Sequence, residues 1–225
     1  MLIPEDLLLL LLDDESGRLR HGTYLDTAVG GALLAELALA QHVEVVKGSG
    51  VWARAKVVPT GSGEPEDDVL AEALATVRHK ERSAQDLVGR LGRGRRAQLL
   101  DRLEQRGILR REDDRVLGLF PRKRWPAVDS SHEDDVRRQL GDAVVRGATP
   151  TERTAALVAL LSAMGVAHQV IDREGLSGGE VRKRAKAIAE GDWAAKAVKD
   201  AIAAVQAAIA ATMVASTSVA ASGGS

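Results

Sequence analysis

The stretch TYLDTAVGGALLAELAL, residues 23–39, decides the fold. Thr23 and Asp26 give the S/T-x-x-D/E pattern of a helix start, in which the hydroxyl caps free amides and the acid favours the positive helix end. Apolar residues then cover nearly every face, and Glu36 is the only charged residue after Asp26. A helix that is apolar all round is normally surrounded by other helices. We therefore expect a central buried helix that carries no catalytic group.

Two adjacent glycines, Gly30 and Gly31, lie in the middle of this helix. Glycine lowers helix propensity, so its presence here needs a reason. We expect a neighbouring helix or a ligand to come close to the backbone at this point.

The composition predicts a mainly α fold. Aromatic residues make up 2% of the 225-residue chain, so the core must consist of Leu, Val and Ala, which favours helices. The chain has no cysteine, which excludes disulfides and thiolate metal sites and fits a reducing cytoplasm. A run of six leucines near the N-terminus is flanked by acids and is too short to span a bilayer. We expect it to form a buried first helix from Pro4 to near Gly17.

The remaining elements are predicted in chain order. Two β-rich runs around Gly-Ser-Gly, within residues 42–58, indicate a hairpin. A helix with an apolar stripe, a short helix capped by Ser83 and a helix ended by Gly107 follow. A second hairpin is expected to turn at residues 112–114. The expected inward positions of the three helices are Val69, Leu70, Ala73, Leu74, Val77, Leu87, Val88, Leu91, Leu99, Leu100 and Leu103.

Four further helices complete the prediction. The first runs from Ser131 to about Val145, and the second opens with a capping box at Thr149 with proline at the first helical position. The third opens with a capping box at Ser177, and an Ala-rich helix covers residues 193–214. We expect one compact helical domain over residues 1–214, built around the central helix with about two β-hairpins on one face. Residues 215–225 are expected to be a disordered tail.

The charge is distributed unevenly along the chain. Residues 78–124 hold fifteen Arg/Lys and seven Asp/Glu, a surplus of eight positive charges, although the whole chain has a net charge of −1. The rest of the chain therefore carries nine excess negative charges. A basic segment on an otherwise acidic protein indicates an anionic partner, such as a membrane surface, a phosphorylated head group or nucleic acid. The alternative is an arginine-rich face that only contacts solvent.

Arg93 and Arg96 are candidates for a phosphate site within this segment. If a helix has begun there, their spacing places them on one face. Two neighbouring guanidinium groups suit a doubly charged phosphate monoester, and glycines at 92 and 94 would let a phosphate approach the backbone at a helix N-terminus. The pattern R-x-x-R is common and is a weak signal by itself.

The second hairpin combines apolar, aromatic and basic residues. Leu117, Leu119, Phe120 and Trp125 surround the basic triplet Arg122-Lys123-Arg124. Aromatic residues beside a basic triplet suit contact with a membrane interface. The alternative is an ordinary hairpin with one face in the core.

These segments resemble the Golgi phosphoprotein 3 family, which has many bacterial relatives. The resemblance covers about residues 3–214 and is carried by EDLLLLLLDDESG, GGALLAELAL, DDVLAEAL, LLDRLEQRGIL and LGLFPRKRWP. It implies a mainly helical fold and a peripheral membrane protein that recognises phosphatidylinositol 4-phosphate.

The resemblance also implies where a lipid would bind. The family's two head-group arginines fall on Arg93 and Arg96, and its membrane-approaching hairpin falls on residues 111–125, with membrane contacts expected at Leu119, Phe120, Arg122, Lys123 and Arg124. The family's site tryptophan falls on His21, and another site arginine falls on Gly30. His21 could stack on or contact a phosphate, and Arg20 or Arg95 could replace the lost charge. These departures put recognition of the 4-phosphate in question.

Two other classes of function fit the sequence less well. Residues 83–125 also read as helix, turn, helix and hairpin, the order of a winged helix-turn-helix DNA-binding protein, but the second helix has few base-reading side chains. An enzyme is disfavoured because GK[ST], HExxH and G-x-S-x-G are all absent and the five histidines are scattered. We expect a non-enzymatic lipid-binding protein without cofactor or metal. It would be cytoplasmic and reversibly associated with the inner face of a membrane, its oligomeric state and protein partners being open.

Overall fold

The computed structural model describes residues 1–13, 16–20, 22–46, 56–116, 120–191 and 196–222. Within these residues the chain forms ten helices and two small antiparallel sheets, which confirms the mainly α fold class. In chain order the elements are α1 (Ile3–Leu11), α2 (Gly22–Leu39), β1 (Val43–Val46), β2 (Lys56–Pro59), α3 (Asp68–His79), β3 (Arg82–Ser83), α4 (Ala84–Gly92), α5 (Arg95–Gln105), β4 (Glu112–Val116), β5 (Phe120–Arg124), α6 (Ser131–Val144), α7 (Glu152–Ala163), α8 (Ala167–Val170), α9 (Gly178–Ala189) and α10 (Lys196–Ser222).

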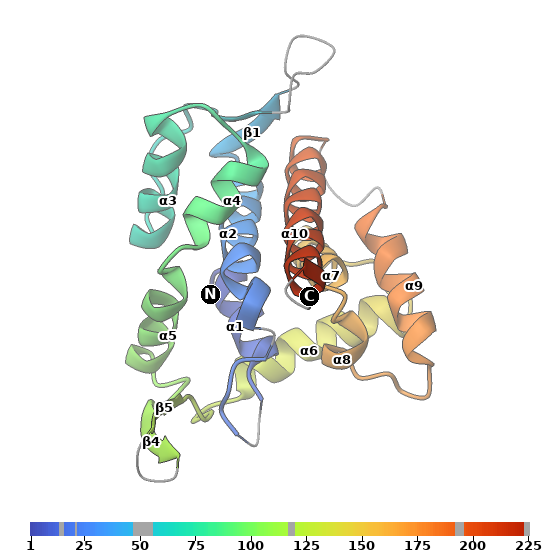
Figure 1. Ribbon diagram of the computed structural model, residues 1–225. Helices are drawn as coiled ribbons and strands as arrows, with labels where there is room; N and C mark the ends of the chain where they lie inside the picture. The colour runs from blue at the N-terminus through green and yellow to red at the C-terminus, as the bar shows by residue number, and fades with distance from the viewer. Residues whose placement is uncertain (14–15, 21, 47–55, 117–119, 192–195, 223–225) are drawn as a thin grey trace.

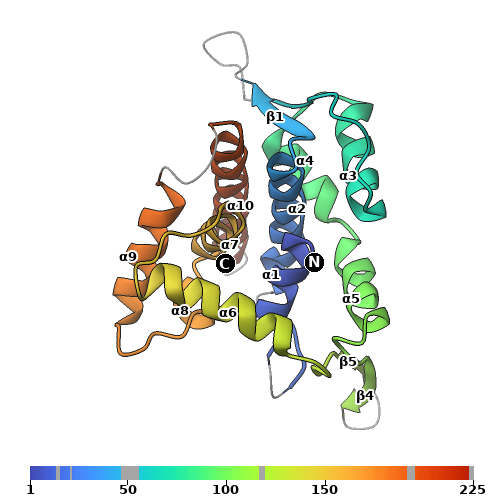
Figure 2. The same cartoon turned by 180° about the vertical axis from the view of Figure 1, so that it is seen from behind.

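Helix α2 is the centre of the molecule, as the sequence predicted. It lies between α4 on one side and α10 on the other, and also contacts α1 and α7 (Figures 1 and 2). Its side chains Leu33, Leu34 and Leu37 are fully buried. The helix begins at Gly22, one residue before the start predicted at Thr23.

The two glycines of α2 allow helices to approach on two sides. A Cβ atom at Gly30 would overlap the carbonyl oxygen of Val88 and lie 2.7 Å from the nitrogen of Gly92, both on α4. A Cβ atom at Gly31 would overlap the side chain of Val205 on α10. The expectation of a close neighbour is therefore confirmed, and the neighbours are helices.

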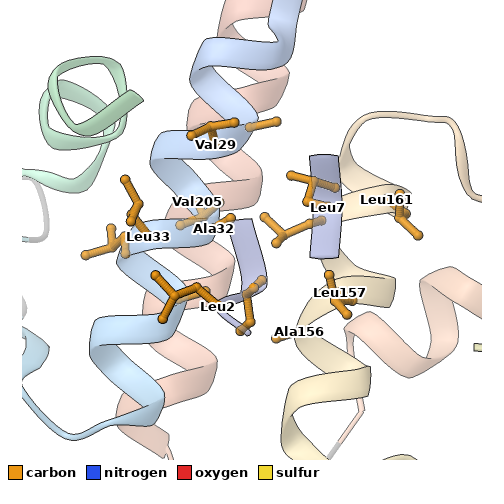
Figure 3. Close-up of a cluster of buried hydrophobic side chains, with 14 of the residues drawn as sticks. Leu2, Leu7, Val29, Ala32, Leu33, Ala156, Leu157, Leu161 and Val205 are labelled. Carbon is orange, nitrogen blue, oxygen red and sulfur yellow. The ribbon is translucent and has the colours of Figure 1, made fainter. Parts of the chain in front are cut away.

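Helix α1 is buried along its whole length. Side chains from α1, α2, α7 and α10 meet in the core, among them Leu7, Ala32, Leu157 and Val205 (Figure 3). The helix ends at Leu11, before the expected stop near Gly17. Gly17 instead has a positive φ of 60°, and its carbonyl accepts a 2.7 Å hydrogen bond from the Trp125 amide.

Both predicted hairpins are present, with one correction. Strands β1 and β2 pair antiparallel and β3 adds a third strand, while the residues between β1 and β2 lie outside the described part. The second hairpin pairs Glu112 with Arg124 and Val116 with Phe120, so the turn predicted at residues 112–114 was wrong. The Glu112 carboxylate contacts Arg124 at 3.2 Å. Because opposite charges on facing strands stabilise a sheet, this acidic residue can lie within a strand instead of in the turn. The β1 and β4–β5 units lie toward opposite ends of the helical body (Figure 1).

The C-terminal helices follow the prediction apart from two boundaries and the short helix α8, which was not predicted. Thr151, not Thr149, caps α7, because its hydroxyl accepts a 3.1 Å hydrogen bond from the Thr154 amide and Pro150 precedes the cap. The capping box of Ser177 and Glu180 is confirmed. Helix α10 extends to Ser222, past the end expected at Val214, since Ser and Thr are poor helix formers but less unfavourable than Gly. Among the described residues, no helix is both long and apolar enough to cross a bilayer.

Candidate anion-binding site

The junction between α4 and α5 places two arginines on either side of an open turn. Helix α4 ends at Gly92, Arg93 is extended, and Gly94 is left-handed with a φ of 76° before α5 begins at Arg95. Arg93 is exposed, and 40% of the Arg96 side chain is accessible. A Cβ at Gly94 would meet no atom within 4 Å. Arg93 precedes α5, so the glycine turn and not helical spacing sets its position relative to Arg96.

The start of α2 lies beside this junction. A Cβ at Gly92 would overlap the backbone carbonyl of Asp26, so the two backbones touch there. The Asp26 carboxylate lies 3.7 Å from Nε of Arg96. The structure therefore brings Arg93, Arg96 and the first turns of α2 together. His21 precedes α2 and lies outside the described residues.

Arg95 binds a different helix from its neighbour. Its guanidinium pairs with Glu72 on α3 and donates a 2.7 Å hydrogen bond to the side-chain oxygen of Gln98. The hydrogen bond from Arg95 lowers the pKa of the Glu72 carboxyl. The charge of Arg95 is thus already matched by an acid on α3, whereas Arg96 contacts α2.

Gly30 cannot carry a side chain in this packing. It is buried, and backbone atoms of α4 occupy the space that a Cβ would need. An arginine at this position would separate α2 from α4. The departure from the family pattern at Gly30 is therefore part of how these two helices pack.

The β4–β5 hairpin contributes a second candidate surface. Phe120, Arg122, Lys123 and Arg124 all lie on β5, while Leu117 and Leu119 lie outside the described residues. The Arg124 side chain is held by Glu112. Trp125 is only 7% exposed and belongs to the core, so its expected place among the interfacial aromatic residues was wrong.

Acidic residues from the rest of the chain fold onto the basic segment. The uneven charge of the sequence therefore becomes much more even in space. Arg93 has no ion pair within the part of the chain that the structure describes, and it remains available to a ligand. The paired residues are Arg78 with Glu64, Arg95 with Glu72, Arg96 with Asp26, Arg102 with Asp67 and Glu5, and Arg106 with Glu5.

Two buried acids at the start of α1 organise a polar cluster that the sequence did not predict. Glu5 is 0% exposed and contacts Arg102 and Arg106 of α5 at 3.1 and 3.2 Å. Asp6 is 1% exposed and contacts His132 of α6 at 2.7 Å and Arg153 of α7 at 2.9 Å. The pattern Pro-Glu-Asp before a leucine run was the only available signal.

Arg153 also bridges α1 to α2. Its guanidinium lies 3.0 Å from the Glu36 carboxylate, and the Ile3 amide donates to the same carboxylate. Burial lowers the pKa of Arg153, but the charges of Glu36 and Asp6 outweigh it and raise this pKa. The cluster therefore fastens α1, α2, α6 and α7 to one another. Its acids are largely buried, whereas Arg153 and His132 are partly exposed, and its ion pairs between helices indicate a structural role.

The described residues contain no group of three or more His, Asp or Glu side chains placed to hold a metal ion. Comparison with known families gives a clear result. The family model for Golgi phosphoprotein 3 (GPP34) matches residues 3–205. The chain belongs to the Golgi phosphoprotein 3 family. No curated protein matches it. Family membership indicates a Golgi phosphoprotein 3-like, non-enzymatic adaptor.

Proposed function

We propose that the protein is a peripheral membrane protein that binds anionic or phosphorylated lipid head groups through Arg93 and Arg96. The observation that carries this proposal is the open Gly94 turn, which holds both arginines next to the start of α2. Guanidinium groups donate charge-assisted hydrogen bonds to phosphate oxygens. The free backbone amides at the start of α5 would add to the attraction.

The β4–β5 hairpin would provide the second contact with the bilayer. It follows α5 directly, so the helix that starts at the arginine site leads to the strand that carries Phe120 and the basic triplet. An interfacial aromatic residue and several basic residues add apolar and electrostatic attraction to an anionic surface. Head-group binding and membrane contact would thus come from the two ends of α5, within one segment of the chain (Figure 1).

The DNA-binding alternative finds less support in the side chains. Helices α4 and α5 and the β4–β5 hairpin do follow the order of a winged helix-turn-helix. However, Arg102 and Arg106 of α5, which would have to face DNA, are paired with Glu5 and Asp67. The outer side of α5 exposes the acidic Asp101.

Vesicle flotation tests the proposal. The double variant Arg93→Glu with Arg96→Glu should lose most binding to vesicles that contain anionic lipid, because two attractive contacts become repulsive. The matched control is Arg173→Glu with Arg182→Glu, which makes the same change of charge at two exposed positions remote in sequence. The control should retain most binding.

The hairpin needs its own variant. Phe120→Ala should weaken binding to every vesicle type about equally, because an interfacial aromatic residue is indifferent to the head group. Only the arginine variant should strongly change the salt dependence. If the arginine variant binds like the parent, these residues form only a solvated face. Tight, sequence-specific retention of duplex DNA at physiological salt would instead favour the winged helix-turn-helix.

A further inference from the structure

We infer that Asp26 sets the head-group preference of this site, so that a phosphodiester with one negative charge is favoured over a phosphomonoester with nearly two. The inference rests on the proposed lipid-binding function and concerns the same site. It commits to the head group of a membrane lipid as the source of the phosphate.

Three charged side chains meet at the turn between α4 and α5 and at the start of α2, and together they carry one net positive charge. Arg93 and Arg96 supply two, and the Asp26 carboxylate removes one. Arg95 is matched by Glu72. Gly30 cannot carry a side chain without separating α2 from α4. A phosphodiester monoanion balances this site, whereas a phosphomonoester carries about −1.5 to −2 at pH 7.

The position of the Asp26 carboxylate would let it discriminate between phosphates of different charge. The 3.7 Å separation from Nε of Arg96 is too long for a hydrogen bond, so the carboxylate offsets the charge of Arg96 without using its N–H donors. Those donors stay free for a phosphate oxygen. A second negative charge on the phosphate would then be repelled by Asp26, and this penalty is larger for a monoester than for a diester.

Asp26 is also fixed in place. Its backbone carbonyl lies against Gly92, and the next turn of α2 lies against α4 at Gly30. The backbone of α2 therefore cannot move back from the α4–α5 junction without breaking the close contacts at Gly92 and Gly30. Rotation of the Asp26 side chain, which is 52% exposed, is its main freedom.

The experiment compares phosphatidylcholine vesicles that contain either phosphatidylglycerol or phosphatidylinositol 4-phosphate, at matched total vesicle charge. The parent should bind the phosphatidylglycerol vesicles more tightly. Asp26→Asn should tighten binding to both by about two- to fivefold, the size expected for one exposed ion pair. The gain should be larger for the phosphomonoester. Asp101→Asn is the matched control, because Asp101 is exposed on α5 and has no ion pair in the described part of the chain. It should leave the ratio of the two affinities unchanged.

Two results would overturn the inference. One is a parent that prefers the phosphomonoester at matched charge, and the other is an Asp26→Asn variant whose affinity ratio equals that of Asp101→Asn. The arginine variant separates this failure from failure of the proposed function. If Arg93→Glu with Arg96→Glu abolishes binding while Asp26→Asn leaves the ratio unchanged, only the role of Asp26 is wrong. If the arginine variant binds like the parent, the site itself is wrong.

Discussion

Replacing Gly30 by alanine tests the packing that positions the candidate site. Alanine has a higher helix propensity, which by itself would stabilise the protein by about 0.5–1 kcal/mol. Against this, the new methyl group would overlap the Val88 carbonyl and lie 2.7 Å from the Gly92 nitrogen. Both are backbone atoms of α4 and cannot rotate away. The two helices must therefore separate.

The size of the effect follows from these opposing contributions. Overpacking of a well-packed core costs about 1–3 kcal/mol and sometimes more, and a backbone clash should fall at the upper end. We expect Gly30→Ala to reduce the free energy of unfolding by about 2 kcal/mol. Gly89→Ala on α4 is the control, because a Cβ there meets no atom within 4 Å, and it should be stabilising by about 0.5–1 kcal/mol.

Urea unfolding followed by circular dichroism measures both variants. Gly31→Ala adds an intermediate case, because its methyl group would meet the side chain of Val205, which can adjust. The expected order of stability is Gly89→Ala, parent, Gly31→Ala and Gly30→Ala. A Gly30→Ala protein as stable as the parent would refute the close contact between α2 and α4. It would also mean that a charged side chain at position 30 could be accommodated next to the candidate site.

Three further outcomes are expected. Leu34→Ala or Leu37→Ala should lower the free energy of unfolding by about 2–5 kcal/mol, because both side chains are fully buried, and unchanged melting temperatures would show that α2 is not central. Arg153→Ala should cost about 3 kcal/mol in urea unfolding, since it leaves Asp6 and Glu36 without their shared cation, whereas Arg138→Ala in an exposed pair should cost less than about 1 kcal/mol. The hydrogen bond from Arg102 lowers the pKa of the Asp67 carboxyl below its ordinary value of 3.8. The ionised carboxylate therefore stabilises the folded protein above that pH, and this stabilisation is lost as the pH falls through the lowered pKa. Asp67→Asn should therefore flatten the pH dependence of the free energy of unfolding below about pH 4, and equal slopes for variant and parent would contradict the pairing.

Features encoded locally could be predicted from the sequence. The all-apolar pattern of residues 23–39 indicated a surrounded helix, and the glycines within it indicated a close neighbour. Ser83 and Ser177 cap the helices they were expected to cap. These features depend on residues within one or two helical turns, where the helical period determines which side chains share a face.

Features that depend on distant residues could not be predicted in the same way. The sequence placed eight excess positive charges in one segment, but it could not show that Glu5, Asp26, Asp67 and Glu72 fold onto them. The prediction of a helix cap also failed where two neighbouring residues could serve as the cap. Thr149 and Thr151 are both followed by residues that suit a helix start, and in the structure the cap of α7 is Thr151.

The candidate site itself combines both kinds of information. The choice of Arg93 and Arg96 came from their pattern in the sequence and from the family resemblance, but helical spacing does not relate them, since Arg93 lies before α5. Their effective charge depends on Asp26, which is seventy residues away from Arg96 in the chain and 3.7 Å away in space. In the proposed site, the family pattern would indicate where a phosphate binds, whereas the acids that fold against it would determine how much negative charge the site accepts. The same arginines beside an asparagine at position 26 would form a site of a different preference.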